Sequence, residues 1–483
     1  MKWCFHIGEY FFFREFWWRL AQQIAKEGDE CVFLVDCKIA EYGIKPEFLK
    51  QGMKFISKVD WCIEHYDQSK KDFGDLSWKE FFPDFVRYKP RAFNYENSVE
   101  VVSQLYQFLD FVFQNEKPDV FLSSCPADLF EQVAYYFHKK YEVPWPALLE
   151  SQLGESITDI YDLEDTNSQF QPTFEKLQEN DISEDEKKFA ENFLDKFISH
   201  KQAPYYTDRD QYIHNSVFIL FEHYIQRLKS LNKKKNIYLR YLWARKHFKK
   251  YDYKSDLIFQ RFIATPFSDI RRQLRIFFQK HFFGFYDKDD SFFLFPLHFQ
   301  PEYTTSVLAT YYSDQLATIS NIAFALPFPY KLYVKEHPAS QGTRPNEFYN
   351  KLEQIPNVVL IHAKEKIEKL IKNSAGVITL SGTAGLEATL SGKPAYVLGK
   401  TFYTYHPLCR KIDNFDELKE MLQADIIHKP VVSNLKSINL RFIVSYLRNS
   451  IAGSIFRGAG DRDTNDYGAI YRDLKKKMEA LKK

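Results

Sequence analysis

Short apolar runs alternate with amphipathic segments in the first third of the chain. Apolar runs of this length, bounded by turn residues, are typical of buried strands, and the segments between them have the length of helices. Strands that alternate with helices predict a parallel sheet. The expected strands are Lys2–Ile7, Glu30–Asp36, Asp119–Ser123 and Pro144–Leu149, and the expected helices are Phe13–Glu27, Val99–Gln114 and Asp128–Tyr141.

The same alternation returns at Ser291 and continues for five strand–helix units. Five such units are enough for a complete second Rossmann-like domain. The expected strands are Phe292–Leu297, Lys331–Lys335, Val358–His362, Gly376–Leu380 and Ala395–Leu398. The expected helices are Thr305–Ala325, Pro345–Gln354, Lys364–Lys372 and Ala384–Leu390, with Asn439–Ser450 as a closing helix.

Two segments of opposite charge separate these regions. Gly154–Asp195 is acidic and poor in apolar residues, so we interpret it as a surface connection. Arg227–Lys280 holds 16 Lys or Arg residues and 3 acidic residues, interleaved with aromatic residues, and most of it has a helical pattern. We therefore expect an N-terminal Rossmann-like domain at 1–153, an acidic connection with a basic helical insertion at 154–290, a C-terminal Rossmann-like domain at 291–435, and a helix and tail at 436–483.

Length and composition add few constraints. The chain has 483 residues, too many for one ordinary core, and its net charge of +2 says little about partners. The six cysteines form no CxxC pair, which argues against a zinc site or a disulfide framework. The N-terminus lacks a signal-peptide pattern, and no run of about 18 apolar residues occurs. These observations favour a cytoplasmic protein.

Two motifs follow expected strands and have the chemistry of an anion site. Lys335-Glu336-His337-Pro338 places a His and a Lys where they can bind a phosphate. Ser381-Gly382-Thr383-Ala384-Gly385 opens a helix, whose N-terminus favours anions. Ligands of open α/β sheets bind outside the carboxyl ends of the strands. The alternative interpretations are a solvated loop for the first motif and an ordinary helix cap for the second.

Other residues near these motifs are further candidates. Glu387 lies one turn into the expected helix and could reach a ribose hydroxyl, or it could be a solvated carboxylate. His298 and Glu302 follow the first strand of the C-terminal domain and supply titratable groups. Glu302 could instead lie at a helix start because the helix dipole favours acids there.

The N-terminal half supplies two candidate general bases. Glu9 follows the first strand, and Asp128 follows the run Ser123-Ser124-Cys125-Pro126. Either carboxylate could accept a proton from an acceptor hydroxyl, although each could also be an acid at a helix start. Asp208 and Asp210 lie in a polar loop, and no carboxylate pair is placed for a metal ion. The sequence therefore predicts neither a metal nor a bound cofactor.

The motifs in combination resemble the bacterial capsule polysaccharide biosynthesis family, whose relatives include Kdo transferases. The similar stretches are PLHFQPEYTTS, Asp314-Gln315, VKEHP and LSGTAGLEATLSGKPAYVLG, within about Phe292–Lys400. The HP and Ser/Thr motifs also resemble those of bacterial sialyltransferases that use CMP-sugars. The resemblance implies a GT-B fold in which two Rossmann-like domains face a cleft, with the donor on the C-terminal domain. It further implies that His337 contacts the donor phosphate and that Ser381 and Thr383 contact the phosphate or ribose.

The resulting hypothesis is a metal-independent glycosyltransferase of surface polysaccharide synthesis, with a nucleotide-sugar donor that is CMP-linked, such as Kdo or a sialic-acid-like sugar. The acceptor would be a saccharide or a glycolipid. The alternatives are a CDP-polyol phosphotransferase, a nucleotide-sugar 2-epimerase and a non-catalytic assembly or export factor. The basic segment could be a solvated face or could contact an anionic membrane peripherally. A nucleic-acid partner is not expected, because no recognition motif accompanies the charge.

Overall fold

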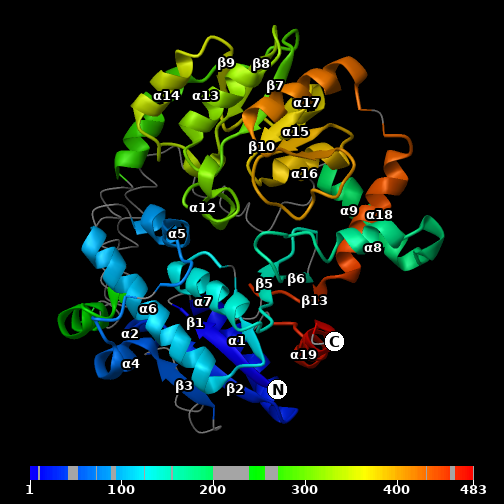
Figure 1. Cartoon of the computed structure of the whole chain (residues 1–483). Coiled ribbons are helices and arrows are strands. Elements are labelled where there is room, and N and C mark those ends of the chain that lie inside the picture. The colour runs from blue at the N-terminus through cyan, green and yellow to red at the C-terminus, as the bar shows by residue number, and fades with distance from the viewer. Residues whose placement is uncertain are drawn as a thin grey trace. The chain divides into compact units, whose positions relative to one another are not determined.

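The chain forms two compact units, each made from separate stretches of sequence. Unit 1 comprises residues 1–161, 216–265 and 450–483, and unit 2 comprises residues 162–215 and 266–449. The computed structural model describes residues 1–8, 11–41, 53–71, 73–88, 94–124, 126–153, 156–198, 239–255, 270–430, 432–456 and 463–481. Figure 1 labels the elements of both units.

Unit 1 is built on a four-stranded parallel sheet with the order β3-β2-β1-β4. The strands are β1 (Lys2–Ile7), β2 (Glu30–Val35), β3 (Lys54–Ser57) and β4 (Val120–Leu122). The helices are α1 (Phe11–Lys26), α2 (Lys38–Glu41), α4 (Lys58–His65), α5 (Trp78–Tyr88), α6 (Tyr95–Glu116), α7 (Leu129–Lys140) and α19 (Tyr467–Leu481). The predicted strand Lys2–Ile7 is confirmed with both ends correct.

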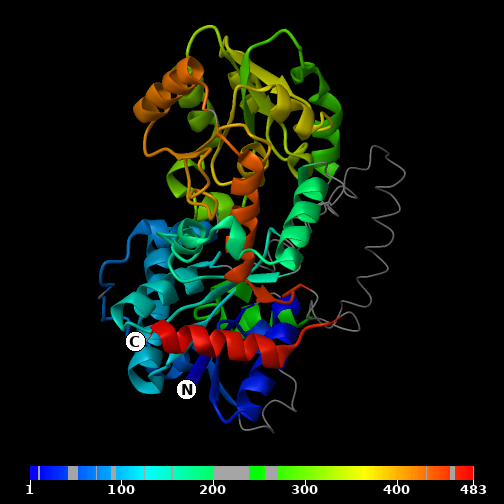
Figure 2. The same cartoon turned by 90° about the vertical axis from the view of Figure 1, so that its right-hand side faces the viewer.

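Alternate residues of β1 serve the two faces of this sheet, as the period of a strand requires. Trp3, Phe5 and Ile7 join the buried cluster that contains residues of α1 and α19. His6 lies on the other face, where its ring stacks on Phe130 of α7 at a centroid distance of 4.1 Å. Figure 2 shows α19, in red, beside the N-terminal end of the chain. The hydroxyl of Tyr471 in α19 donates to Asp29 at 2.8 Å.

A small antiparallel sheet completes unit 1. It has the order β13-β6-β5 and consists of β5 (Ala147–Glu150), β6 (Ser156–Ile160) and β13 (Ile451–Ala452). Glu150 accepts hydrogen bonds from the Ser454 hydroxyl at 2.6 Å and from the Ile455 N–H at 2.8 Å. The C-terminal residues therefore complete the N-terminal unit.

Unit 2 is built on a six-stranded sheet with the order β12-β11-β10-β7-β8-β9, which is parallel throughout. The strands are β7 (Phe292–Pro296), β8 (Lys331–Lys335), β9 (Val358–Ile361), β10 (Val377–Thr379), β11 (Ala395–Val397) and β12 (Cys409–Lys411). The first strand, β7, lies in the middle, and the chain reverses its direction of growth between β7 and β10. This is the doubly wound order of a Rossmann-like domain.

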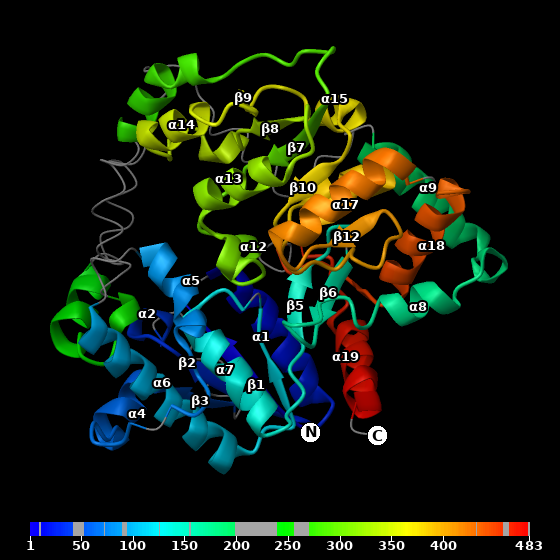
Figure 3. The same cartoon turned by 45° about the horizontal axis from the view of Figure 1, so that its top comes forward.

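Helices cover both faces of the unit 2 sheet. On one face, apolar residues of the strands pack with α13 (Gln315–Ala325), α14 (Asn346–Glu353) and α17 (Phe415–His428). On the other face, they pack with α15 (Ile367–Asn373) and α16 (Thr383–Leu390). Figure 3 shows α13 and α17 lying across the first face. The predicted α/β class with two Rossmann-like sheets is therefore confirmed.

One helix expected in unit 2 is broken. In place of a continuous helix at Thr305–Ala325, the chain forms α12 (Tyr303–Ser306), a 3-10 turn at Thr310–Tyr312 and then α13. The carboxylate of Asp314 accepts hydrogen bonds from the N–H groups of Leu316 and Ala317, so it caps a new helix start. The apolar periodicity continues through the break, which is why the pattern did not predict it.

The acidic segment is more than the surface connection expected. Its described part forms α8 (Gln171–Lys176) and α9 (Glu184–Ile198), which pack with α18 (Leu435–Arg448). Phe170, Phe174, Phe193 and Phe197 are all buried. These aromatic residues recur at a spacing of four, so each pair lies on one helical face while the acidic residues occupy the other.

The basic segment is divided between the units. Residues 239–255 belong to unit 1, where Ala244 is part of the core. Helical residues 270–278 belong to unit 2, where the Arg272 guanidinium donates to the carbonyls of Ala339 and Gln341 at 2.9 and 2.8 Å. The run Lys233-Lys234-Lys235 of this basic segment lies outside the described residues. At least part of the positive charge therefore has internal partners.

Candidate active site

Three loops of unit 2 meet at the carboxyl edge of its sheet. His298 follows β7, His337 follows β8 and Ser381 follows β10. Because β10, β7 and β8 are neighbours and parallel, the residues after them lie at the position where the strand order reverses. The Ser381 hydroxyl donates to the carbonyl of Thr304 at 2.8 Å, which ties the β10 loop to the β7 loop. The rings of Phe299 and His337 lie 6.1 Å apart.

His298 occupies the centre of this edge and is 7% exposed. Its Nε2 lies 3.0 Å from the Thr379 hydroxyl. Among the residues that the structure describes, its Nδ1 has no hydrogen-bond partner. Burial, with the positive charge of Arg344, lowers the pKa of His298 to about 3. The imidazole is therefore neutral at physiological pH and retains one unused ring nitrogen.

Gln315 explains the Asp-Gln pair of the sequence resemblance. Its side-chain oxygen accepts from the His298 N–H at 2.8 Å, and its amide donates to the His298 carbonyl at 3.0 Å. The break before α13 is needed for this arrangement because Asp314 caps the helix and Gln315 begins it. This pair thus fixes the loop that carries His298.

Gly382 allows the β10 loop to approach His298 closely. A Cβ atom at this position would lie 2.9 Å from Nε2 of His298 and 3.0 Å from the hydroxyl of Thr379. The Gly382 N–H donates to that hydroxyl at 3.2 Å, and its carbonyl accepts from Tyr403 at 2.6 Å. Position 382 therefore requires glycine because a larger side chain would clash with His298 and Thr379.

The buried carboxylate of Glu336 stabilises the loop that contains His337 and Pro338. Glu336 is 1% exposed and accepts hydrogen bonds from the His337 N–H at 2.7 Å, from Arg344 at 2.7 Å and from the Tyr349 hydroxyl. Arg344 also donates to the His298 carbonyl at 2.7 Å, so one guanidinium joins the β7 and β8 loops. Sequence reasoning missed both Glu336 and Arg344 as site residues.

His337 itself is oriented by its own turn. Its Nδ1 accepts a hydrogen bond from the Ala339 N–H at 3.1 Å. An Nδ1 that accepts leaves Nε2 to carry the proton of the neutral ring. His337 is partly exposed, so this N–H can donate to a ligand. The local geometry suits the phosphate contact that the sequence predicted.

Lys335 and Glu387 have surroundings that differ from those expected. The Lys335 ammonium is buried and donates to the carbonyl oxygens of Ala363 at 3.0 Å and Glu336 at 3.4 Å, and burial lowers its pKa to about 8. Glu387 lines a cavity of about 750 Å³ together with Glu368. Burial, with the charge of Glu368, raises the pKa of Glu387 to about 8. The donor contacts of both residues stay predictions.

Glu302 and Thr383 begin helices, as the alternative interpretation allowed. Glu302 is the N-cap residue of α12, where its backbone carbonyl accepts from the Ser306 hydroxyl at 2.7 Å and its carboxylate accepts from the Thr304 hydroxyl at 3.4 Å. Thr383 is the first residue of α16. These contacts are those of helix starts. The predicted catalytic role of Glu302 and the predicted donor contact of Thr383 stay predictions.

Unit 1 carries a second cluster at the corresponding edge of its sheet. His6 lies near the end of β1, Asp36 follows β2, and Asp128 and Glu131 follow β4. All four side chains are buried, and Lys254 joins them at 1% exposure. The His6 ring lies 3.1 Å from Glu131 and 3.3 Å from Asp36. Lys254 binds the carboxylates of Asp36 and Asp128, the latter at 2.7 Å.

The charges of this cluster compensate one another. Burial disfavours the imidazolium of His6, but the carboxylates of Asp36 and Glu131 outweigh burial and raise its pKa to about 10. Burial also opposes ionisation of Asp36 and Asp128, but the ammonium of Lys254 and the imidazolium of His6 lower the pKa of both carboxyls. Both histidine and lysine are therefore cationic between two ionised aspartates.

Glu131 has a different electrostatic balance. Burial raises its pKa to about 7, and the hydrogen bond with His6 only partly opposes the effect. A cavity of about 180 Å³ reaches this carboxyl and is lined by His6, Gly8, Arg14, Arg87 and Asp128, among other residues. A carboxyl of this pKa beside a cavity can accept a proton near neutral pH.

The predicted base Asp128 is less suited to proton transfer than Glu131. One Asp128 oxygen caps α7 by accepting from the Glu131 N–H at 2.9 Å, and the other accepts from Lys254. The other predicted base, Glu9, lies outside the described residues. The sequence pattern did not single out Glu131 as a base, because an acid three residues after Asp128 is the usual pattern of a capped helix start.

His6, Asp36 and Asp128 could in principle hold a metal ion, since they place ligand atoms within 4.8 Å of one another. The Lys254 ammonium already contacts both aspartates. A cation beside it would be repelled, and His6 would have to lose its proton to become a ligand. The donor set therefore fits an internal ion cluster better than a metal centre.

Comparisons with known proteins locate the family signal in part of the chain. Residues 244–417 match the family described as capsule polysaccharide biosynthesis protein. This range contains both motifs after β8 and β10, and it confirms the family resemblance. No curated protein matches the chain. None of the described helices has the length and apolar character needed to cross a membrane.

Solved structures show only distant likeness. The KpsC β-Kdo 2,7-transferase of Thermosulfurimonas dismutans is 12% identical, with a TM-score of 0.32, covering 78% of this chain and 90% of that chain. The β-Kdo 2,4-transferase structure of the same protein is 12% identical, with a TM-score of 0.35, covering 68% and 79%. UDP-GlcNAc 2-epimerase from Neisseria meningitidis is 13% identical, with a TM-score of 0.25, covering 93% and 100%.

Proposed function

We propose that this member of the capsule polysaccharide biosynthesis protein family is a glycosyltransferase that uses a nucleotide-sugar donor. The donor would be CMP-linked, with Kdo or a sialic-acid-like sugar, and would bind to unit 2. The observation that carries the proposal is the meeting of His298, His337 and the Ser381–Thr383 turn at the point where the sheet order reverses. Ligands of doubly wound sheets bind at this point.

The chemistry of this edge supports an anionic leaving group. The Nε2–H of His337 can donate to a phosphate oxygen, and the N-terminus of α16 favours negative charge. His298 stays neutral, and its Nε2 contact with the Thr379 hydroxyl joins the β7 loop to β10. Preorganised donors of this kind stabilise the charge that develops when the nucleotide leaves.

We assign the general base to Glu131 of unit 1. Its pKa of about 7 lets it hold a proton taken from an acceptor hydroxyl, and His6 orients it through the 3.1 Å contact. Asp128 would then position the cluster by capping α7 and binding Lys254. In this scheme the donor lies on unit 2 and the acceptor on unit 1.

The direct test of the donor site is replacement of His337 with alanine. Loss of a hydrogen bond to the leaving phosphate should cost about 2–4 kcal/mol in the transition state, or about 30- to 1000-fold in kcat/KM. The binding of CMP, measured by calorimetry, should weaken in the same variant. His362→Ala, which changes a partly exposed histidine after β9, is the matched control. Unchanged transfer and unchanged CMP affinity in the His337 variant would contradict the proposal.

We expect transfer to persist in excess EDTA. Cationic and backbone groups supply the phosphate contacts in this proposal, and Lys254 already contacts the two aspartates of the candidate metal cluster. The measurement compares initial rates with and without the chelator. Complete loss of activity that Mg²⁺ or Mn²⁺ restores would show that a metal is required. An altered nucleotide sugar formed without any acceptor would instead indicate an epimerase.

Peripheral contact between the basic segment and an anionic membrane remains a prediction. Lys254 and Arg272 are engaged inside their units, so the charge available to a surface is smaller than the sequence suggests. A cytoplasmic location likewise stays a prediction.

A further inference from the structure

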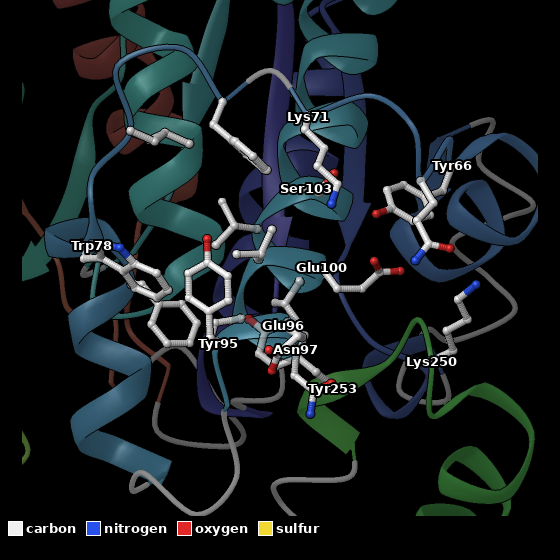
Figure 4. A pocket seen from close by; sticks show the side chains of 18 of the residues that line it. Tyr66, Lys71, Trp78, Tyr95, Glu96, Asn97, Glu100, Ser103, Lys250 and Tyr253 are labelled. Carbon is white, nitrogen blue, oxygen red and sulfur yellow. The ribbon is translucent and has the colours of Figure 1, made fainter.

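Unit 1 contains a cavity of about 1260 Å³ whose lining residues differ from those of the cavity beside Glu131. Its walls come from α5, α6, residues 66–71 and 73–77, and residues 249–253. Figure 4 shows Trp78 and Tyr95 on one side of the cavity, and Lys71, Lys250 and Tyr66 on the other, with Glu100 between them. Cavities for single small molecules measure about 300–1,000 Å³. This one has room for a larger ligand, such as several linked sugars.

The aromatic side of the cavity is open to solvent. Trp78 is 58% exposed and Tyr95 is 68% exposed, and their rings lie 6.0 Å apart with an angle of 40° between their planes. Trp78 also packs edge-on against the buried Phe81, which fixes its orientation. Two adjacent aromatic rings that are open to solvent form an apolar surface that a ligand can cover. The C–H face of a sugar ring packs well on such a surface.

The opposite side supplies charge and hydrogen bonds. Lys71, Lys249 and Lys250 line the cavity and are exposed, and the structure shows no ion pair for them within its described residues. Glu96, Asn97 and Glu100 lie near the start of α6 and can bind sugar hydroxyls. Three ammonium groups against two carboxylates leave a net positive cavity. An oligosaccharide that carries carboxylates satisfies both the aromatic side and the lysines.

The cavity is structurally joined to the buried charge cluster. Tyr253 lines it, and the Tyr253 hydroxyl donates to the buried Asp84 at 3.0 Å. The next residue, Lys254, binds Asp36 and Asp128. One short segment thus forms part of the cavity wall and completes the cluster that contains Glu131.

We propose that this cavity binds an acidic oligosaccharide, with Trp78 and Tyr95 as the stacking surface and Lys71 and Lys250 as the partners of its carboxylates. The identification of this ligand as the acceptor rests on the proposed function. The binding itself does not, because it follows from the cavity, its aromatic wall and its charge.

The test is calorimetric titration of the full chain with two probes of equal length. The first is a tetramer of α2,8-linked sialic acid, and the second is maltotetraose, which is neutral. We expect the acidic probe to bind more tightly, with an affinity that falls as salt is added. Trp78→Ala should raise the Kd of the acidic probe about tenfold, since a large stacking surface is lost. Trp243→Ala removes a tryptophan from unit 1 outside the cavity and should change little.

A second pair of variants tests the charge. Lys71→Gln with Lys250→Gln should raise the Kd of the acidic probe about fivefold or more at low salt and remove the preference over maltotetraose. Lys70→Gln with Lys246→Gln changes two exposed lysines of the same segments that do not line the cavity, and it should leave the preference intact. Thermal unfolding of each variant confirms that the fold is retained.

The possible results separate the two proposals. No binding of the acidic probe, equal binding of both probes, or an unchanged Kd in both the Trp78 variant and the double lysine variant would overturn the inference about the cavity. Titration of the same samples with CMP reports on unit 2. A chain that binds CMP but not the acidic probe contradicts only the cavity inference. A chain that binds the acidic probe but not CMP contradicts only the donor assignment.

Discussion

Replacing Lys254 with methionine is expected to lower the free energy of unfolding by about 3–5 kcal/mol. Methionine keeps most of the side-chain volume but removes the ammonium that binds Asp36 and Asp128. Both carboxylates are buried, so they would lose their main compensating charge in a region of low dielectric constant. Urea unfolding followed by circular dichroism measures the change.

The control and the pH dependence make this prediction specific. Lys246→Met changes an exposed lysine of the same segment and should alter stability by less than about 0.5 kcal/mol. The pKa of Asp36 and Asp128 is lowered in the folded state, so their contribution to stability is present above the ordinary pKa and is lost as the pH falls. In the Lys254 variant the ammonium that lowers both pKa values is gone, so burial favours protonation of the two carboxyls as the pH falls toward their ordinary pKa. The deficit of the variant should therefore be larger at pH 7 than at pH 4. If the Lys254 variant lost less than about 1 kcal/mol in its free energy of unfolding at pH 7, the ion cluster would not have the stabilising role assigned to it.

Replacing Glu131 with glutamine is expected to reduce kcat by about 10²- to 10⁴-fold, the usual contribution of a general base. Glutamine keeps the shape and can still contact His6, but it cannot accept the proton. Donor affinity should not change, because the substitution lies in unit 1. Steady-state rates together with CMP titration separate the two effects.

The pH profile provides a second measurement on the same residue. A base works in its deprotonated form, so wild-type kcat/KM should fall with decreasing pH below about 7, the pKa of Glu131. The ionised carboxyl costs stability, since its folded pKa lies above the unfolded value, and this cost appears as the pH rises from about 4.5 to 7. Glutamine should therefore not unfold unit 1. Glu64→Gln, which changes an exposed acid of α4, is the control. A Glu131 variant with wild-type kcat would assign the base elsewhere.

The strand pattern predicted much of both sheets. Lys2–Ile7 and Lys331–Lys335 match β1 and β8 at both ends because each is a continuous buried run between clear turns. Lys54–Ser57 and Cys409–Lys411 were not expected. These short strands lie at the edges of their sheets and mix polar with apolar residues, so they lack the apolar signal of a central strand.

The candidate donor site was also partly predictable. His298, His337 and Ser381 each follow a strong strand signal, and parallel strands place their carboxyl ends at one edge. Their supporting contacts were not predictable: Gln315 falls inside a longer expected helix, and Glu336 and Arg344 appear in sequence as loop charges. Their roles depend on contacts across loops, such as the hydrogen bond from Arg344 to the His298 carbonyl.

The sequence by itself determined the class of the fold and the edge of the second sheet that carries the candidate donor site, because strand periodicity and turn residues are local properties. Only the tertiary structure brought Lys254 to Asp36 and Asp128, which are 218 and 126 residues away in the chain. The tertiary structure likewise places Glu131, which in the sequence is an acid at a helix start, in contact with His6. Pairings of buried charges are decided by packing, since a lysine or an acid has the same sequence signature whether it is solvated or enclosed.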